Sequence, residues 1–282
     1  QPSITDFDDY ATPTIAASSA WAPVTVLFRD LKQAGWGRKM PLTPDAASGI
    51  MFEALPAHPA SKRPPSGLFN GMIRPLVPYG MRGAIWYQGE GNNARAYQYR
   101  RLLPAIIRGW RAAWGEGDFP FGIVQLPSYG AVRPEPHGSR WAELREAQRM
   151  ALAVPNTGLA VTIDQGDPDD VHPKQKAEVG RRLALWALGA VYGKAVVYSG
   201  PIYDSMRVEN GRVRVRFRDD GGGLESRNGG PLEGFAIAGA DRTFHWAEAR
   251  IEGADVVVWN ADVPVPLAVR YAWADSPDAT LL

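Results

Sequence analysis

The sequence contains no cysteine in its 282 residues. Disulfide bonds, thiolate metal sites and a cysteine nucleophile are therefore excluded, although the absence of cysteine does not fix the redox compartment. No apolar run of 18 residues occurs, so no transmembrane helix is expected. An excess of charge of one sign is missing as well, because 31 basic and 30 acidic residues leave a formal net charge of +1. That balance suggests neither a nucleic-acid-binding surface nor an electrostatic membrane anchor.

The N-terminus also lacks familiar features. Gln1-Pro2-Ser3-Ile4 has neither the basic start nor the apolar stretch of a signal peptide, and no initiator methionine is present. We therefore expect an N-terminus that is processed, clipped or only partly recorded.

Composition and pattern divide the chain into three parts. Residues 1–65 are rich in proline and weakly periodic, which predicts an irregular wrapping segment that follows a missing N-terminal part. Residues 66–199 alternate strand-like and helix-like stretches. Residues 200–282 consist of short β-type runs separated by turn residues.

The middle part predicts a series of βαβ units. Short apolar runs alternate with stretches of helical spacing, in the order 83–87, 94–114, 121–126, 139–152, 158–163 and 173–191. Pro104 is expected to kink or restart the first helix, and Ser139 is expected to cap the second. Strands and helices in this order predict an α/β fold with a parallel sheet between helices, whose ligands bind at the carboxyl ends of the strands.

The last part predicts a small antiparallel β module. Residues 207–217 alternate around Asn210-Gly211, a strong hairpin signal. Further short runs of β character follow at 232–238, 247–251, 255–259 and 267–273.

The first candidate for chemistry is Trp86-Tyr87-Gln88-Gly89-Glu90-Gly91-Asn92-Asn93, directly after the first predicted strand. Glycines beside polar side chains at a strand end let backbone N–H groups point into a site, and an asparagine amide can add a donor. Such donors stabilise a developing oxyanion. The alternative is a strand-to-helix turn in which Asn92 or Asn93 caps the next helix.

The second candidate is Asp164-Gln165-Gly166-Asp167-Pro168-Asp169-Asp170-Val171-His172-Pro173, which follows the third predicted strand. It holds one of only four histidines in the chain. A carboxylate can fix a histidine tautomer and stabilise the imidazolium formed in general-base catalysis. Two other interpretations stay open: a solvated acidic turn, or a divalent-cation loop whose spacing does not match an EF-hand.

Together these blocks resemble the sialate O-acetylesterases, which belong to the SGNH-hydrolase-like esterases. The run 83–92 is similar to the family's Trp-Tyr-Gln-Gly-Glu-x-Asn block, and the run 164–173 to its histidine block. Further similar segments lie at 67–73, 234–239 and 269–275. The resemblance implies a three-layer α/β/α SGNH-hydrolase-like parallel sheet with an appended antiparallel β module.

The resemblance implies a general base and its acid. His172 is the expected base, and Asp170 matches the aspartate of the family's histidine block. Asp169 stands at the three-residue spacing used in many SGNH hydrolases, so the acid stays open between the two.

The resemblance also implies an oxyanion hole. Gly89 would contribute its backbone N–H and Asn92 its side-chain amide, while Gln88 and Glu90 would shape the site or contact substrate. The mechanism that it implies requires no metal and no organic cofactor.

The family's nucleophilic serine, in a Gly-Gln-Ser-Asn block, has no counterpart here. Ser66 and Ser128 lie in other contexts, and Ser3, Ser18 and Ser19 lack the flanking motif. We expect the serine on a companion N-terminal chain or on a part that the sequence lacks, with a non-catalytic descendant as the third explanation. A companion chain would stay associated because the interface would be a domain core cut in two.

The expected activity is that of a serine-type esterase that removes O-acetyl groups from sialic acid or other acetylated glycans. A non-catalytic carbohydrate-binding protein is an alternative, because ten Trp and ten Tyr would suit sugar stacking. A glycoside hydrolase using Glu90 with Asp169 or Asp170 is another, and needs carboxyl groups roughly 5 to 10 Å apart. The resemblance favours an exported protein, periplasmic or extracellular.

Overall fold

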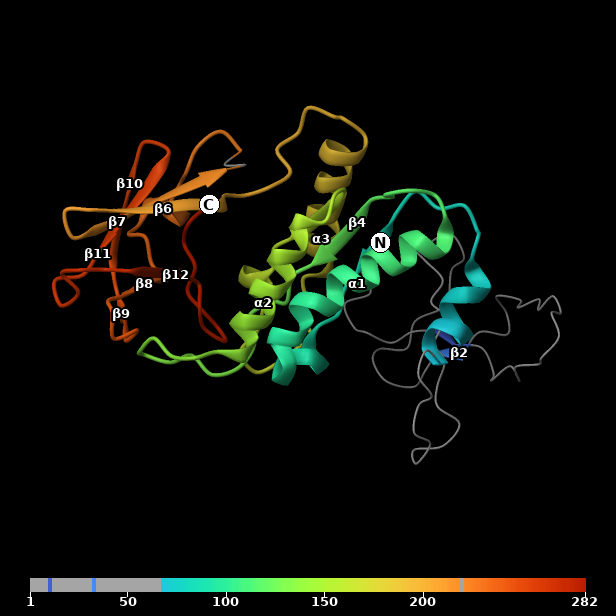
Figure 1. Cartoon of the computed structure of the whole chain (residues 1–282), viewed down its shortest axis with the longest axis horizontal. Coiled ribbons are helices and arrows are strands. Elements are labelled where there is room, and N and C mark those ends of the chain that lie inside the picture. The colour runs from blue at the N-terminus through green and yellow to red at the C-terminus, as the bar shows by residue number, and fades with distance from the viewer. Residues whose placement is uncertain (1–9, 12–31, 34–66, 219–220) are drawn as a thin grey trace. The chain divides into compact units, whose positions relative to one another are not determined.

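A computed structural model gives the structure of the protein (Figure 1). It describes residues 10–11, 32–33, 67–218 and 221–282. The chain forms two compact units, Gln1–Val77 and Pro78–Leu282. The predicted division at 1–65, 66–199 and 200–282 remains a prediction.

The first unit contributes few described elements. Strands β1 (Tyr10–Ala11) and β2 (Lys32–Gln33) pair in antiparallel fashion. A π-helical turn at Phe69–Ile73 leads into a 3-10 turn at Arg74–Leu76. Apart from β1 and β2, the predicted wrapping segment lies outside the described residues, as do the serines at 3, 18, 19 and 66.

The second unit contains a parallel sheet in the order β3-β4-β5. Its strands are β3 (Ala84–Trp86), β4 (Phe121–Val124) and β5 (Thr157–Ala160). Ala84 pairs with Phe121, which in turn pairs with Thr157. All four residues of β4 are buried, as expected for the middle strand of a sheet covered on both faces. The predicted parallel α/β arrangement is thus confirmed.

Helices cover both faces of this sheet. They are α1 (Ala96–Trp114), α2 (Arg140–Met150) and α3 (Lys176–Trp186) (Figure 1). On one face, Trp110 of α1 packs edge-on against Phe121, with ring centroids 6.0 Å apart. On the other face, Trp186 of α3 lies against Gly122 and Gly158, where any Cβ would collide with its indole. The layer order predicted from the resemblance, with helices on both faces of the sheet, is confirmed.

No helix among the described residues is long and apolar enough to cross a membrane.

The first helix differs from its prediction at Pro104. The helix neither breaks nor restarts there, but runs continuously for 19 residues. Proline removes one backbone hydrogen bond, whereas the buried side chains on both sides of it, including Leu103 and Ile107, keep the helix packed on its neighbours.

The β module forms two antiparallel sheets. One has the order β10-β11-β7-β6 and the other β12-β8-β9. The strands are β6 (Ile202–Glu209), β7 (Arg212–Arg218), β8 (Phe235–Ala238), β9 (Phe244–Trp246), β10 (Glu248–Glu252), β11 (Asp255–Trp259) and β12 (Ala268–Tyr271). Asn210 and Gly211 both take positive φ, 49° and 76°, so the predicted hairpin turn joins β6 to β7.

Arg145 of α2 holds the chain that follows β12. Its guanidinium donates to the backbone carbonyls of Ala272, Ala274 and Asp275, and its side chain is almost fully buried. Burial lowers the pKa of this group to about 10, while the Asp275 carboxylate acts in the opposite direction. The Ser139 hydroxyl, which caps α2 by accepting from the Ala142 N–H, donates to the Asp275 carboxylate at 2.6 Å. Helix α2 is thus bonded to the end of the β module at two points.

We expect Arg145→Met to lower the free energy of unfolding by about 3 kcal/mol, because two buried carbonyls and one partly buried carbonyl lose their charged donor. Urea unfolding followed by circular dichroism measures the change. Arg149→Met on the same helix is the matched control, since Arg149 is partly exposed and forms a surface ion pair with Glu146. Equal losses in both variants would contradict the role given to Arg145.

Candidate active site

The first block begins where β3 ends, and a series of hydrogen bonds fixes its side chains. The indole Nε1–H of Trp86 donates to the Tyr99 hydroxyl at 3.1 Å. That hydroxyl donates to Gln88, with its oxygen 3.0 Å from Oε1 and 3.2 Å from the backbone oxygen. The Gln88 amide in turn donates to Asn92 Oδ1 at 2.9 Å. Because Oδ1 of Asn92 is engaged, its Nδ2 group is turned away from Gln88.

A buried glutamine on α2 holds the backbone of this block. Gln148 is fully buried; its Nε2 donates to the Gln88 carbonyl at 3.1 Å and the Val124 carbonyl at 3.3 Å. Its Oε1 accepts the Leu126 N–H at 2.9 Å. Gly89 lies directly against this support, because a Cβ there would stand 2.9 Å from Leu144 and 3.3 Å from the Gln148 amide.

The predicted oxyanion donor Gly89 already has a partner. Its backbone N–H donates to the Glu90 carboxylate at 2.9 Å. This N–H therefore points where a negatively charged oxygen can reach it, but an oxyanion would have to displace Glu90. The predicted capping by Asn92 or Asn93 is not observed, since no side chain caps the turn at Glu90–Arg95 or helix α1.

The second block is anchored to the segment that follows β4. Gly166 packs so closely on Ser128 that a Cβ would overlap the Ser128 backbone. The Gly130 N–H donates to the Pro168 carbonyl at 2.9 Å, and the buried Thr162 hydroxyl donates to the Gln125 carbonyl at 2.5 Å. The loop after β5 is thus held at the carboxyl edge of the sheet.

Not every carboxylate of the second block is free for chemistry. Asp164 forms a two-pronged ion pair with Arg182 of α3, at 2.6 and 2.7 Å. Partial burial would raise its pKa, but the hydrogen bonds from Arg182 and Gln165 outweigh burial and keep the pKa below its usual value. Asp164 therefore ties the loop to α3 and stays ionised.

His172 and Asp170 lie side by side in this loop. The His172 Nδ1 atom is 3.4 Å from Asp170 Oδ1, which also accepts the His172 backbone N–H at 2.9 Å. That backbone hydrogen bond is the main reason why the pKa of Asp170 lies below its usual value. The Asp169 N–H donates to Asp167 Oδ1 at 3.0 Å, which turns the chain just before Asp170.

Lys176 links the two blocks and was missed by the sequence analysis. It stands in the first turn of α3, with its Nζ 4.8 Å from the centroid of the Tyr87 ring. Partial burial lowers the pKa of its ammonium group, and the charges of Glu90 and Asp170 act in the opposite direction. The Lys176 ammonium therefore interacts electrostatically with one carboxylate from each block, Glu90 and Asp170. Its position four residues after His172, at the start of a predicted helix, was the signal that could have identified it.

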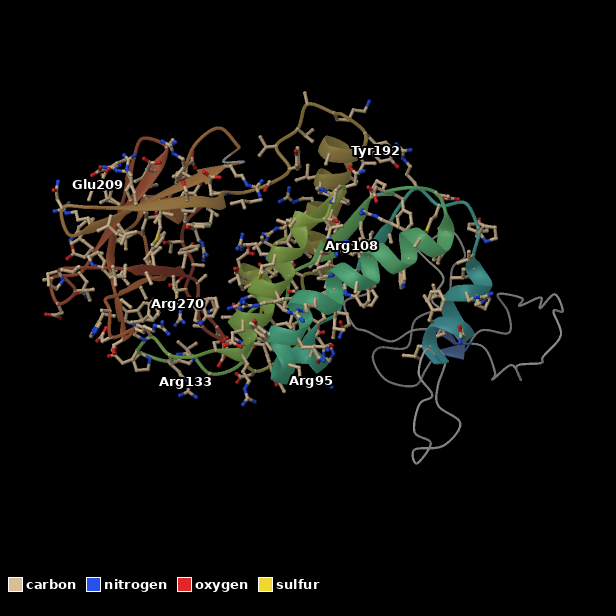
Figure 2. All side chains as sticks on the ribbon, viewed as in Figure 1. Arg95, Arg108, Arg133, Tyr192, Glu209 and Arg270 are labelled. Atoms are coloured by element: carbon tan, nitrogen blue, oxygen red, sulfur yellow. The ribbon has the colours of Figure 1, made fainter. Side chains whose placement is uncertain are left out.

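The serines nearest these blocks have structural partners. The Ser128 hydroxyl donates to the Ile163 carbonyl at 2.7 Å, and Ser276 donates to the Gly130 carbonyl at 2.8 Å. Ser139 caps α2. Arg95, two residues after the first block, and Arg108 of α1 are both exposed (Figure 2).

We expect Gly166→Ala to lower the free energy of unfolding by about 1–3 kcal/mol, because the added methyl group overlaps the Ser128 backbone. Gly91→Ala is the matched control in the other block, since nothing lies within 4 Å of its Cβ position. Thermal unfolding of the two variants measures the difference. An unchanged melting temperature for Gly166→Ala would contradict the close packing of the loop.

Comparisons with known proteins identify the family to which the chain belongs. The profile of the carbohydrate esterase family of sialic acid-specific acetylesterases matches residues 44–188. The sialate O-acetylesterase of Mus musculus is 30% identical over 235 residues, covering 75% of this chain and 43% of that protein. The sialate O-acetylesterase of Rattus norvegicus is 36% identical over 154 residues, covering 49% of this chain and 28% of that protein.

A solved structure agrees. The crystal structure of a carbohydrate acetylesterase from Xanthomonas citri superposes with a TM-score of 0.73 at 45% identity, covering 76% of this chain and 50% of that one. The chain thus spans half the length or less of these relatives. Because the family profile matches more than half of its residues, the chain belongs to the sialic acid-specific acetylesterase family of carbohydrate esterases.

Proposed function

We propose that this protein removes O-acetyl groups from sugars by serine-type ester hydrolysis. The observation that carries the proposal is the pairing of His172 with Asp170. Lys176 of α3 interacts with the charge of Asp170 and with that of Glu90 in the Gly89–Asn92 turn. A histidine paired with a carboxylate suits acyl transfer, and the Gly89 N–H and the Asn92 amide are the proposed donors to the oxyanion.

The chemistry follows from these groups. A serine hydroxyl attacks the acetyl carbonyl while His172 takes its proton, and Asp170 stabilises the resulting imidazolium. The carbonyl oxygen becomes negative and is stabilised by Asn92 Nδ2 and the Gly89 N–H. His172 then protonates the departing sugar oxygen. Water, deprotonated by the same histidine, attacks the acetyl-serine, and collapse releases acetate and restores the serine.

The Gly89 N–H becomes available only when the Glu90 carboxylate releases it. Lys176 offers Glu90 an alternative partner, since the two charges already interact. Glu90 and Gln88 then border the bound sugar. A glycosidase mechanism through Glu90 gains no support, because Glu90 is engaged with the donor that an esterase needs.

The nucleophile, in this proposal, comes from outside the 282 residues, on a further segment of the protein or on a companion chain. The basis for this part of the proposal is the absence of a Gly-Gln-Ser motif from these 282 residues. The relatives are named for sialate and for carbohydrate acetyl esters, so acetylated sialic acid or another acetylated glycan is the proposed substrate. An exported setting is part of the same proposal.

We expect His172→Ala to abolish acetate release from an acetylated sugar, with a loss of about a thousandfold or more, because the general base is gone. The His172 side chain is 67% exposed, so the substitution should leave the fold intact. His245→Ala, in β9 of the β module, is the control. Labelling with a serine-reactive fluorophosphonate followed by intact mass identifies the polypeptide that carries the nucleophile. Undiminished hydrolysis in His172→Ala would contradict the mechanism.

A comparison of the variants Asp170→Asn and Asp169→Asn tests which carboxylate orients His172. We expect Asp170→Asn to lower kcat by about a hundredfold or more, because its carboxylate lies beside His172 Nδ1. Asp169→Asn should keep most of the activity, since the hydrogen bond that Asp169 makes in this turn, to Asp167 Oδ1, comes from its backbone N–H, which the substitution leaves in place. Steady-state kinetics at neutral pH test this, and the reverse order of effects would assign the role to Asp169.

A further inference from the structure

We propose that Tyr99 is a positioning residue for the oxyanion hole: its hydroxyl sets the orientation of the Gln88 amide and, through Gln88, that of the Asn92 amide. The catalytic consequence rests on the proposed esterase function. The structural part, a relay that runs from Tyr99 through Gln88 to Asn92, stands on the hydrogen bonds alone.

The relay has a defined direction. The Trp86 indole N–H can only donate, and it occupies an accepting position of the Tyr99 hydroxyl at 3.1 Å. The single hydroxyl proton is therefore left for the Gln88 oxygens, with Oε1 the nearer at 3.0 Å. With its oxygen so engaged, Gln88 presents its NH2 group to Asn92 Oδ1 at 2.9 Å.

An amide has an acceptor end and a donor end, so each contact decides the next. If Gln88 turned by half a rotation, its oxygen would face Asn92, which would then donate its own NH2 group to Gln88. That NH2 group would no longer be available to an oxyanion. The Tyr99 proton therefore favours the one arrangement in which Asn92 keeps its donor for the substrate.

The surroundings of Tyr99 support a fixed role. Its side chain is only 1% exposed, so water cannot replace the hydroxyl. Burial raises the pKa of the phenol, an effect that the Trp86 hydrogen bond opposes and that the Glu90 charge reinforces, so the hydroxyl keeps its proton near neutral pH.

The same helix offers a matched control. Tyr97 stands one position before Gln98 and two before Tyr99, yet its side chain is 72% exposed and its ring packs against the Arg100 guanidinium at 4.9 Å. Tyr97→Phe removes a hydroxyl from α1 without touching the relay. Tyr99→Phe removes the hydroxyl proton that orients Gln88 and keeps the ring that fills the core.

The catalytic effect should fall on kcat. A donor to the oxyanion acts mainly in the transition state, and loss of a whole donor costs about 100- to 1,000-fold in kcat. Tyr99→Phe only frees the amide to turn, so we expect a loss of about tenfold with little change in KM. In an Asn92→Ala background, Tyr99→Phe should cost nothing further, because the group that it positions is gone.

The experiment compares Tyr99→Phe with Tyr97→Phe in two ways. NMR of the 15N-labelled chain follows the side-chain NH2 signals of Gln88 and Asn92, with the backbone spectrum as the control for folding. Kinetics measure acetate release from an acetylated monosaccharide such as glucose pentaacetate. We expect Tyr99→Phe alone to shift both NH2 signals and to lower kcat. If that variant does not fold, Gln88→Leu breaks the same relay one step later.

Each outcome has a distinct meaning. Unchanged Gln88 and Asn92 signals in Tyr99→Phe overturn the relay. Shifted signals with unchanged kcat, or an equal further loss in the Asn92→Ala background, overturn its catalytic role. If the unsubstituted protein, with its nucleophile-bearing part present, releases no acetate, the proposed function fails and takes the catalytic role with it, while the NMR comparison still decides the relay.

Discussion

The fully buried side-chain amide of Gln148 holds the ends of two neighbouring strands together. It donates to the carbonyls of Gln88 and Val124 and accepts the Leu126 N–H. Breaking any of these bonds would leave a buried polar group without a partner, which costs about 1–3 kcal/mol, so the amide has one stable orientation. The turn that starts at Gly89 therefore begins from a fixed point, and the relay from Tyr99 to Asn92 can act with precision.

Helix α2 connects that fixed point to the β module. Along a single helix, Ser139 and Arg145 bind the segment after β12, and Gln148 binds the strand ends. Arg270 of β12, labelled in Figure 2, places its guanidinium carbon 3.8 Å from the ring centroid of Phe244 in β9 and 4.6 Å from that of Trp273 in the segment after β12. The β module thus supports the helix that holds the strand ends.

The two chemical blocks come from strands that are not neighbours, since β4 lies between β3 and β5. Groups outside both motifs position them. Ser128 and Gly130 contact the histidine loop, and the Lys176 ammonium interacts with the charges of Glu90 and Asp170, one from each block. Glu90 takes part in both contacts: its carboxylate accepts the Gly89 N–H, and its charge interacts with that of Lys176.

The sequence by itself determined the local structure, because short-range rules govern it. Alternation, turn residues and caps predicted the parallel strands, the Asn210-Gly211 hairpin and the Ser139 cap, all of which the structure confirms. The motif spacing pointed to the family, which the profile match shows. The predicted roles of His172, Asp170, Gly89 and Asn92 remain predictions.

Only the tertiary structure decided which polar groups meet. The partners of Tyr99 and Gln148 lie 11 to 60 residues away in the chain, a separation at which no local pattern identifies a partner. It also decided that α1 continues through Pro104, that Asp164 pairs with Arg182, and that the Glu90 carboxylate accepts the Gly89 N–H. Local propensity selects the elements, whereas the register of packed helices on a sheet selects the hydrogen bonds between them.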